Sequence, residues 1–250
     1  MLRFEGKTAI VTGGSGGIGA AIAVRLGQEG CRVLLAALHQ DALDKAAAQV
    51  KAAGAPDAFG MVCDVSDEAA VEATAKACVD RFGRLDVVVN NAGLMTFKAL
   101  PDFTQDDWLG VLKVDLLGAM HFTRQAFARM GQNGAGGGAI VNIASVHAVM
   151  TTPNVAPYAA SKAALLSLTR STAIEGKAKG IRANAILPGA IDTPMLWSNP
   201  NLKSGAEKLD PKDVGKPEHI AAAVAFLASA DAAFVTGASL AVDGGRLAQL

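Results

Sequence analysis

Short apolar runs alternate with longer segments of helical periodicity from one end of the 250-residue sequence to the other. The runs are rich in Val, Ile and Leu without strict polar–apolar alternation, which is typical of parallel strands covered on both faces. They are TAIVTG, RVLLAA, AFGMVC, LDVVVN, GAIVNIAS, IRANAI and SLAVDG. We therefore expect an α/β protein with a Rossmann-like, doubly wound fold, in which a seven-stranded parallel sheet is flanked by helices.

No linker, charge block or tandem repeat divides this pattern, so residues 1–250 are predicted to form a single domain. The Gly-rich residues 131–138 are expected to form a flexible surface loop. Residues 193–215 lack strand character over a length that is unusual for a loop in a compact domain. We predict that this second stretch is a mobile lid over the substrate.

Charge and cysteine content narrow the possible partners. Lys and Arg together number 23, as do Asp and Glu, so the formal charge is zero and gives no reason to expect nucleic acid or a membrane surface as a partner. The N-terminal apolar run is too short for a secretory signal, and no run approaches the length of a membrane span. Cys31, Cys63 and Cys78 have no short paired spacing, so neither disulfides nor a metal site are predicted. We expect a cytoplasmic protein that acts on a small molecule.

A phosphate-binding candidate follows the first strand, where residues 12–19 read TGGSGGIG and lead into a helix. Glycines allow a close approach of backbone N–H groups to a pyrophosphate, whose charge the helix N-terminus favours. An ordinary turn between strand and helix is the alternative. The candidate cofactor contacts here are Gly13, Ser15, Gly16, Gly17, Ile18 and Gly19.

Two further strand ends carry small or polar residues. Asp64 follows the third strand, where its carboxylate can accept a hydrogen bond from an adenine amino group, although capping of the next helix by Ser66 or Asp67 is an equally physical use of this region. Residues 90–93, NNAG, close the fourth strand and would let a cofactor approach at the glycine. A purely structural turn is the alternative, particularly for Asn91.

These motifs and three others occur in one order along the chain: TGGSGGIG, Asp64-Val65, NNAG, Ser145, YAASK and Pro188-Gly189 followed by Thr193. In this order they resemble the classical short-chain dehydrogenase/reductase family over essentially the whole chain. The resemblance implies an NAD(P)-dependent oxidoreductase that transfers a hydride between a nicotinamide and a secondary alcohol or ketone. It also implies cofactor contacts by Asp64, Val65, Asn91, Ala92, Gly93, Tyr158, Lys162, Pro188, Gly189, Ile191 and Thr193.

The resemblance assigns the proton-transfer chemistry to Tyr158 and Lys162, the ends of YAASK. A free Tyr has a pKa near 10 and is a poor base at neutral pH. The Lys162 ammonium, one helical turn away, and an oxidised nicotinamide would both favour the phenolate. Lowering the pKa by about three needs roughly 4 kcal/mol, the interaction of two unit charges about 4 Å apart at an effective dielectric of about 20. We therefore expect Tyr158 to transfer the proton, and Lys162 to lower the pKa of Tyr158 and to bind the nicotinamide ribose.

Ser145 and Asp115 complete the catalytic candidates. The resemblance implies that Ser145 hydrogen-bonds the substrate oxygen, although an isolated Ser at a strand end is more often a cap. Asp115 departs from the family, which usually has at this position an Asn that connects a proton relay to the Lys. A carboxylate here could keep the backbone part of that role, strengthen the field that holds Lys162 protonated, or form only a local ion pair.

The end of the second strand bears on the choice of nucleotide. An acidic residue there would pair with the ribose hydroxyls of NAD, whereas Arg would bind the additional phosphate of NADP. This chain has Ala37, Leu38 and His39 instead, and Gly16 also fills a position that often carries a basic residue. We expect NADP or NAD as the cofactor, with a slight preference for NADP or dual use.

The candidate substrate pocket consists of residues that follow strands and residues of the lid. They are Leu94, Met95, Ser145, His147, Met150, Met195, Leu196 and Trp197. Several of these are core contacts in the alternative interpretation, because Met and Leu near strand ends usually are. The expected substrate is a small polar secondary alcohol or ketone, a sugar or polyol. A 3-oxoacyl thioester (acyl-carrier-protein) reductase is the alternative within the same chemistry, and a catalytically silent dinucleotide-binding sensor is the alternative of another class.

The resemblance also implies a homotetramer. Family members commonly dimerise through two long helices, expected here near Gln105–Met130 and Val155–Lys179, and pair again through the last strand, ASLAVDGG. The Ala-rich sequence AASKAALLSLTRSTA suits close helix packing, although packing within the domain explains it equally well.

Overall fold

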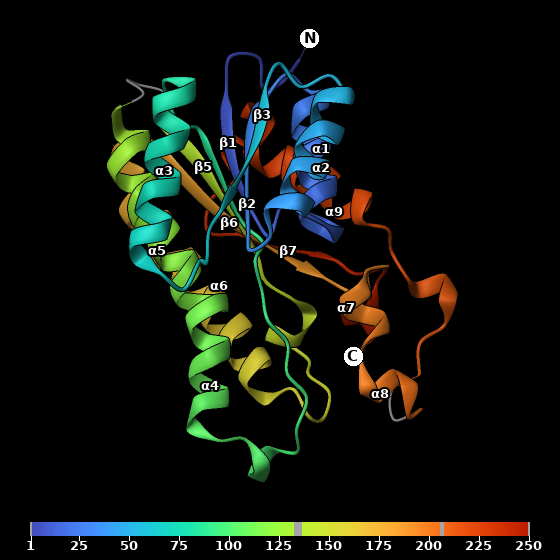
Figure 1. Ribbon diagram of the computed structural model, residues 1–250. Helices are drawn as coiled ribbons and strands as arrows, with labels where there is room; N and C mark the ends of the chain where they lie inside the picture. Colours follow the sequence, from blue (N-terminus) through green and yellow to red (C-terminus); the bar gives the residue numbers. More distant parts are fainter. Residues whose placement is uncertain (1, 133–136, 206–207, 250) are drawn as a thin grey trace.

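A seven-stranded parallel sheet forms the centre of the computed structural model, which describes residues 2–132, 137–205 and 208–249 (Figure 1). The strand order is β3-β2-β1-β4-β5-β6-β7. The strands are β1 (Thr8–Thr12), β2 (Arg32–Ala37), β3 (Ala58–Val62), β4 (Val87–Asn90), β5 (Gly138–Ile143), β6 (Ile181–Pro188) and β7 (Ser239–Val242). Each coincides with one of the predicted apolar runs, so the doubly wound α/β fold is confirmed.

Burial explains the continuous apolar sequences of the central strands. Every residue of β1 and β4 is buried, because helices cover both faces of the sheet. β7 lies at the edge of the sheet, where it has a neighbouring strand on one side only, and it is mostly exposed.

Two groups of helices sandwich the sheet (Figure 1). On one face lie α1 (Gly17–Gln28), α2 (Gln40–Ala52) and α9 (Pro217–Ala228), and on the other α3 (Glu68–Phe82), α5 (Gly118–Arg129) and α6 (Ala156–Gly176). The apolar face of each helix fits the core: Leu26 and Val224 join one cluster, and Cys78 and Phe122 join the other. Among the described residues, no helix is both long and apolar enough to cross a membrane.

The order in which the strands are added to the sheet reverses beside β1. β1 pairs in parallel with β2 on one side and with β4 on the other. In open parallel sheets such a switch point leaves a crevice at the carboxyl ends of the strands, because the connections on the two sides run to opposite faces. All of the motifs quoted above lie after strands or at the start of helices, at this end of the sheet.

A π-helical turn interrupts the long helix that was expected near Gln105–Met130. The helix is divided into α4 (Gln105–Leu112), the π turn η2 (Lys113–Leu117) and α5. Asp115 lies in the π turn, where the extra residue redirects the side chains of one turn. The second expected helix is present as α6, which is extended by the 3-10 turn η6 (Lys177–Lys179).

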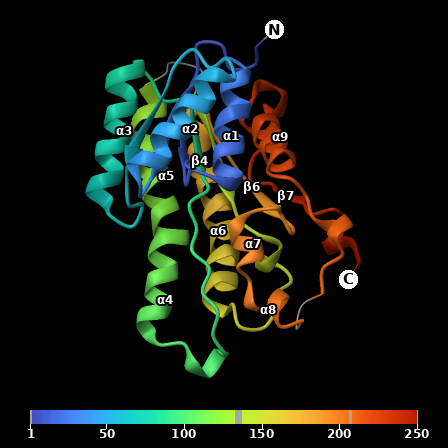
Figure 2. The same ribbon diagram turned by 45° about the vertical axis from the view of Figure 1, so that its right-hand side comes forward.

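The predicted lid contains short helical turns joined by irregular segments. These turns are α7 (Pro194–Trp197), α8 (Pro200–Lys203) and the 3-10 turn η7 (Pro211–Asp213), which project from the same end of the sheet as α4 (Figure 2). The base of the segment is closed, because Asp192 N donates to Gly215 O (2.8 Å) and Gly215 N donates to Ala190 O (2.8 Å). Residues 206–207 of this segment, and residues 133–136 of the predicted Gly-rich loop, lie outside the described residues. That the segment moves as a lid stays a prediction.

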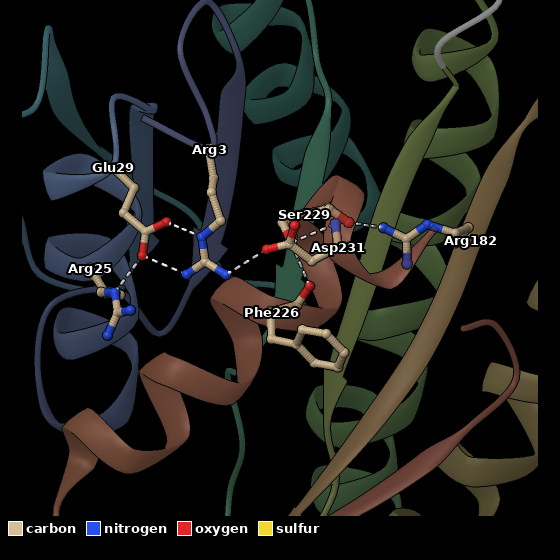
Figure 3. A network of polar contacts seen from close by, with 7 residues as sticks. All are labelled: Arg3, Arg25, Glu29, Arg182, Phe226, Ser229 and Asp231. Atoms are coloured by element: carbon tan, nitrogen blue, oxygen red, sulfur yellow. Dashed lines mark hydrogen bonds and ion pairs between the residues drawn. The ribbon is translucent and has the colours of Figure 1, made fainter. Parts of the chain in front are cut away.

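Ion pairs and caps hold the opposite, amino end of the sheet together (Figure 3). Arg3 contacts both Glu29 and Asp231, and so connects the start of the chain to the loops after α1 and α9. Arg182, at the start of β6, donates to Leu227 O (2.8 Å) and Ser229 O (2.9 Å). A guanidinium at this position satisfies carbonyl groups that the C-terminus of α9 leaves without intrahelical partners.

Candidate active site

A cavity of about 400 Å³ opens at the carboxyl ends of β1, β4, β5 and β6. It is bounded by the Gly-rich turn after β1, the NNAG segment after β4, the residues after β5, the first turns of α6 and the start of the lid. Of the predicted site residues, the cavity is lined by Gly13, Ser15, Gly16, Gly17, Ile18, Asn91, Ala92, Gly93, Met95, Ser145, His147, Tyr158, Lys162, Pro188, Gly189, Ile191, Thr193, Met195 and Leu196.

The Gly-rich turn needs glycine for two different reasons. Gly13 has φ +62°, and a Cβ on Gly19 would lie 2.2 Å from Gly13 O, so side chains are excluded beneath the turn. A Cβ on Gly16 would meet nothing within 4 Å, because this residue faces the open cavity at the N-terminus of α1. The turn is tightly packed on the side of Gly19 and open to the cavity at Gly16, and it places backbone N–H groups at a helix N-terminus. This arrangement fits the pyrophosphate of a dinucleotide.

Asn91 connects the NNAG segment to the Gly-rich turn. Its Nδ2 donates to Thr12 O (2.9 Å) and Gly13 O (3.3 Å), while its backbone N donates to Thr12 Oγ1 (2.9 Å). The side chain therefore has the structural function that was the alternative interpretation, although the residue also lines the cavity.

Tyr158 and Lys162 lie on successive turns of α6, with both side chains buried against the cavity. Lys162 Nζ is 3.1 Å from Asp115 Oδ2, donates to Ile143 O (3.2 Å) and lies 5.4 Å from the centre of the Tyr158 ring. The ammonium is thus fixed from three directions, by the π turn, by the end of β5 and by α6.

Asp115 holds more than the ammonium. Its Oδ1 accepts from Leu94 N (2.7 Å), and its Oδ2 accepts from Ser161 Oγ (3.5 Å) as well as from Lys162. A Cβ on Gly93 would lie 3.3 Å from Lys162 Nζ, so the NNAG segment passes close over this ion pair. The residue is 1% exposed, and the π turn brings its carboxylate to the segment after β4 and to α6.

Burial and two neighbouring charges act on the pKa of Tyr158 in different directions. Burial raises the pKa of the phenol, the Lys162 charge lowers it, and the Asp115 charge raises it again, so that the pKa of Tyr158 lies above its usual value. The Lys162 charge lowers this pKa in the expected direction, but among the residues of the chain burial and Asp115 outweigh it. The expected pKa below the usual value also included the charge of an oxidised nicotinamide, so it stays a prediction. Burial alone would lower the pKa of Lys162, but Asp115 and Tyr158 together raise it, so Lys162 is firmly protonated.

Ser145 begins the 3-10 turn η5 (Val146–Ala148) after β5 and is buried beside the phenol. Its hydroxyl accepts from His147 N (3.1 Å), and its proximity to the phenol lowers the pKa of Tyr158. The His147 ring packs edge-on against Tyr158, with ring centres 5.8 Å apart. A substrate oxygen between Ser145 and Tyr158 would therefore meet two hydroxyl groups on one wall of the cavity.

Several predicted site residues do not line the cavity. They are Gly19, Ala37, Leu38, His39, Asp64, Val65, Leu94, Asp115, Met150 and Trp197. Asp64 Oδ1 accepts from Ser66 N (2.9 Å) and Ser66 Oγ (2.7 Å), while Asp67 caps α3. Val65 is buried in the core beneath Gly118. Asp64 thus stabilises the turn and Val65 the core, and their contacts with the cofactor stay a prediction.

Trp197 is the clearest correction to the predicted pocket. Its Nε1 donates to Asp192 Oδ1 (2.7 Å), and the residue is 52% exposed, so its ring lies outside the cavity. The lid instead contributes Pro194 and Asn199, which were missed together with Ile143, Ala144, Val146, Ala190 and Arg246. Arg246 was not predicted because it lies near the C-terminus, beyond all of the motifs, and only the folded chain brings it to the site.

A dinucleotide cradle at the switch point beside a buried Tyr–Lys pair defines an NAD(P)-dependent oxidoreductase that acts on hydroxyl groups and the corresponding ketones. Residues 13–246 match the family model described as enoyl-(acyl carrier protein) reductase. With relatives named as dehydrogenases that are at least 39% identical over nearly its whole length, the chain belongs to the short-chain dehydrogenase/reductase family. The alternative of a silent sensor is therefore dropped.

Three relatives cover nearly the whole chain. The 3beta-hydroxysteroid dehydrogenase 1 of Eggerthella lenta is 39% identical over 96% of this chain and 94% of the relative. The cis-4-hydroxycyclohexanecarboxylate dehydrogenase of Sinomonas cyclohexanicum is 40% identical over 98% of both chains. The NADP-dependent (R)-specific alcohol dehydrogenase of Lentilactobacillus kefiri is 37% identical over 99% of both.

Solved structures show the same fold. Levodione reductase superposes with a TM-score of 0.92 at 38% identity, covering 99% of this chain and 100% of that chain. NAD+-bound xylitol dehydrogenase superposes with a TM-score of 0.89 at 35% identity, covering 97% of this chain and 100% of that chain.

Proposed function

We propose that Tyr158 transfers the proton that accompanies hydride transfer, with Ser145, Lys162 and Asp115 around it. The observation that carries this proposal is the juxtaposition, in one buried cluster beside the cavity, of the phenol, the Ser145 hydroxyl and the Lys162–Asp115 ion pair. It is supported by the Tyr158 ring lying against both Lys162 and His147, which fixes the hydroxyl at the cavity wall.

The bound dinucleotide would supply or accept the hydride at the carbinol carbon. In oxidation, the C–H bond of the alcohol gives up its electron pair as hydride while the O–H proton passes to the Tyr158 oxygen, and the C=O double bond forms. In reduction, the Tyr158 hydroxyl donates the proton to the carbonyl oxygen. The Ser145 hydroxyl donates a hydrogen bond to that oxygen and stabilises the charge that develops on it. Lys162 keeps a positive charge next to the phenol and is placed to bind the ribose.

For the cofactor, we propose NADP or dual use of NADP and NAD. β2 ends at Ala37 and is followed by Leu38 and His39, so no carboxylate at this position repels a 2′-phosphate. Relatives of both kinds exist, since one is named NADP-dependent and one solved structure is NAD+-bound. The proposal fails if kcat/KM with NAD exceeds that with NADP by tenfold or more.

For the substrate, we propose a small polar secondary alcohol or ketone, a sugar or polyol. The relatives act on hydroxyl groups of rings and chains of different sizes, among them xylitol, a steroid and a cyclohexane acid. The test is a panel of sugars, polyols, ring alcohols, ketones and a 3-oxoacyl thioester, each assayed with both cofactors by nicotinamide absorbance. Preferred turnover of the thioester would replace the polyol proposal by the 3-oxoacyl reductase alternative.

We also propose a cytoplasmic homotetramer. Apolar side chains are exposed on the two helices expected at one interface, with Leu109 on α4 and Ile174 on α6, and at the edge strand β7, with Leu240. The three buried thiols suit a reducing compartment. A mass near that of the single 25.4 kDa chain in light scattering would refute the tetramer.

A further inference from the structure

A buried asparagine of the predicted lid contacts the loop that leads into α6. Asn201, in α8, is 3% exposed. Its Nδ2 donates to Pro153 O (2.9 Å), and its Oδ1 accepts from Asn154 Nδ2 (3.1 Å). Figure 2 shows α8 beside this loop. Asn201 therefore connects the lid to the residues directly before the helix that carries Tyr158.

Asn154 joins a third segment to this contact. Its backbone O accepts from Lys98 N (3.0 Å), which belongs to the segment after β4. Among the described residues, Asn154 is the one non-glycine residue with a positive φ, +70°. Asparagine tolerates this left-handed conformation better than most residues, and the conformation persists only where the surroundings hold it. The loop is therefore held at the residue that contacts both the lid and the segment after β4.

The three connected segments form walls of the same cavity. On the lid wall, which residues 194–196 and 199 form, Asn199 Oδ1 accepts from Asn201 N (2.9 Å). Met95 lines the cavity from the segment after β4 and packs on the cluster that contains Tyr158. The Asn154–Asn201 contact therefore sets the position of the lid wall relative to the wall that carries Tyr158.

Apolar packing does not fix the lid wall in the same way. Neither α7 nor α8 contributes a residue to the apolar core clusters of the described residues. A wall that is held by a few hydrogen bonds can be displaced by the loss of one side chain while the core stays folded. The cavity of about 400 Å³ must also hold the nicotinamide end of a dinucleotide, so the space for the substrate is small and its extent depends on the lid wall.

We propose that Asn154 and Asn201 determine the size of the substrate, because they fix the lid wall. Secondary alcohols and ketones that fit between this wall and the hydroxyl groups of Ser145 and Tyr158 are accepted, and bulkier ones are excluded. Neither asparagine is among the described lining residues, so both act by positioning Asn199 and its neighbours. This inference rests on the proposed function and names what limits its substrate to small molecules.

Two substitutions remove the contact, one from each side. Asn154→Gly deletes the side chain and keeps a residue that adopts a positive φ freely. Asn201→Ala deletes the amide and keeps a good helix former in α8. Ser198→Ala is the matched control and should behave as the wild type, because Ser198 is an exposed lid residue whose Oγ donates to Met195 O (3.0 Å) within its own turn.

The probes are cyclohexanone, 4-methylcyclohexanone and 4-tert-butylcyclohexanone, assayed in the reducing direction with the preferred dinucleotide. For the wild type we expect kcat/KM to fall by about tenfold or more from the smallest ketone to the largest, since the wall excludes the added carbons. Each variant should reduce this ratio by about fivefold or more, through a lower KM for the largest ketone and a higher KM for the smallest. The KM for the dinucleotide should stay within about twofold, because the Gly-rich turn is unchanged.

The double variant tests whether the two side chains act as one unit. Asn154→Gly combined with Asn201→Ala should have the selectivity of Asn201→Ala alone, because that substitution already removes the acceptor of Asn154 Nδ2. If the effects of the two substitutions on selectivity instead multiplied, the two asparagines would act independently and the proposed contact would be wrong.

Hydrogen exchange tests the contact itself, without any substrate. In Asn154→Gly, the backbone amides of residues 201–204 should exchange faster by about threefold or more, although the substituted residue is 47 residues away from Asn201 along the chain. Unchanged exchange would show that the lid wall is held without this contact, and would overturn the inference.

Two kinetic results would also overturn it: a wild type that reduces the three ketones equally well, and variants that lose activity by the same factor for all three, as expected of a merely structural residue. If the wild type reduces none of them but turns over another compound of the panel, inhibition of that reaction by the three ketones gives the same comparison of sizes. If no compound of the whole panel is turned over with either cofactor, the proposed function fails, which differs from turnover with unchanged size selectivity.

Discussion

Two buried aspartates, at opposite ends of the sheet, show how the same residue serves different purposes. Asp86, just before β4, accepts from Thr8 N (3.0 Å) and from Arg84 Nε (2.7 Å) and Nη2 (2.6 Å), and it lies 3.4 Å from Lys7 Nζ. Asp115, near the carboxyl end of β4, pairs with Lys162 at 3.1 Å and binds Leu94 N. Both carboxylates are almost fully buried.

The cations make the difference. The side chains of Arg84 and Lys7 are 34% and 42% exposed, so their charges are screened by water and the pairs close the amino end of the sheet. The Lys162 side chain is 4% exposed and lies beside a phenol at a cavity. A buried ion pair is weak evidence for stability, because desolvation offsets the attraction. Of the two ion pairs, Lys162–Asp115 is the one that lies beside the cavity, where it can influence a reaction.

The Lys162–Asp115 pair can influence the reaction only if proton transfer takes place at Tyr158. Tyr158→Phe removes the hydroxyl that we propose exchanges the proton with the substrate, and we expect kcat to fall by about a thousandfold or more. Dinucleotide affinity and the urea midpoint should change little, because the ring remains. Turnover above about one tenth of wild type would assign the proton transfer to another group.

Removal of the buried cation should cause the largest loss of stability. Lys162→Met leaves the Asp115 carboxylate buried without its partner, which typically costs about 3–5 kcal/mol of unfolding free energy. The matched variant Lys7→Met removes an exposed partner of Asp86 and should cost less than about 1 kcal/mol. Urea denaturation measures both. Equal losses would mean that burial does not distinguish the two pairs.

The sequence predicts the local features of this molecule better than its long-range contacts. The seven strands and the Gly-rich turn were predicted, because each is encoded by a few adjacent residues whose pattern states their burial or backbone geometry. Tyr158 and Lys162 are four residues apart on one helix, so their proximity was also local information.

The charge balance could not be predicted in the same way. Whether Lys162 lowers the pKa of Tyr158 below its usual value depends on the burial of the phenol and on the distance from Asp115, which a π turn sets. Trp197 and Arg246 show the same limit: one contacts Asp192 outside the cavity, and the other reaches the cavity through the packing of Leu247. The packing of Leu247 joins distant parts of the chain, and the Trp197–Asp192 bond depends on the conformation of residues 192–197, so no short motif encodes either contact.

Asp115→Asn should move the pH dependence of the reaction. After burial and the Lys162 charge, the Asp115 charge is the next influence on the phenol, and it raises the pKa of Tyr158. Its removal lowers that pKa while Lys162 stays protonated. Oxidation needs the phenolate and reduction needs the phenol, so the rise in oxidation and the decline in reduction should both move to lower pH.

The amide of this variant can still accept from Leu94 N, so the variant should fold. The chain has a single tyrosine, and the ultraviolet absorbance of tyrosinate therefore titrates Tyr158 alone. Profiles of kcat/KM in both directions complete the measurement. If the pKa of Tyr158 did not change, Asp115 would only position the segment after β4. If that pKa rose, Lys162 would have lost its proton when the Asp115 carboxylate was removed.

Asp86→Asn should have the smallest effect and serves as the control for that change. It removes the same unit of charge from a buried aspartate, but the amide can still accept from Thr8 N, and Arg84 and Lys7 reach water. We expect a loss of about 1–2 kcal/mol in unfolding free energy, as for a hydrogen bond to a charged group, and no movement of the tyrosinate titration or the pH profiles. If the pH profiles moved as much as with Asp115→Asn, the net charge of the protein rather than the position of the carboxylate would control the pKa of Tyr158. The buried aspartates at the two ends of the sheet would then not differ in their effect on the reaction.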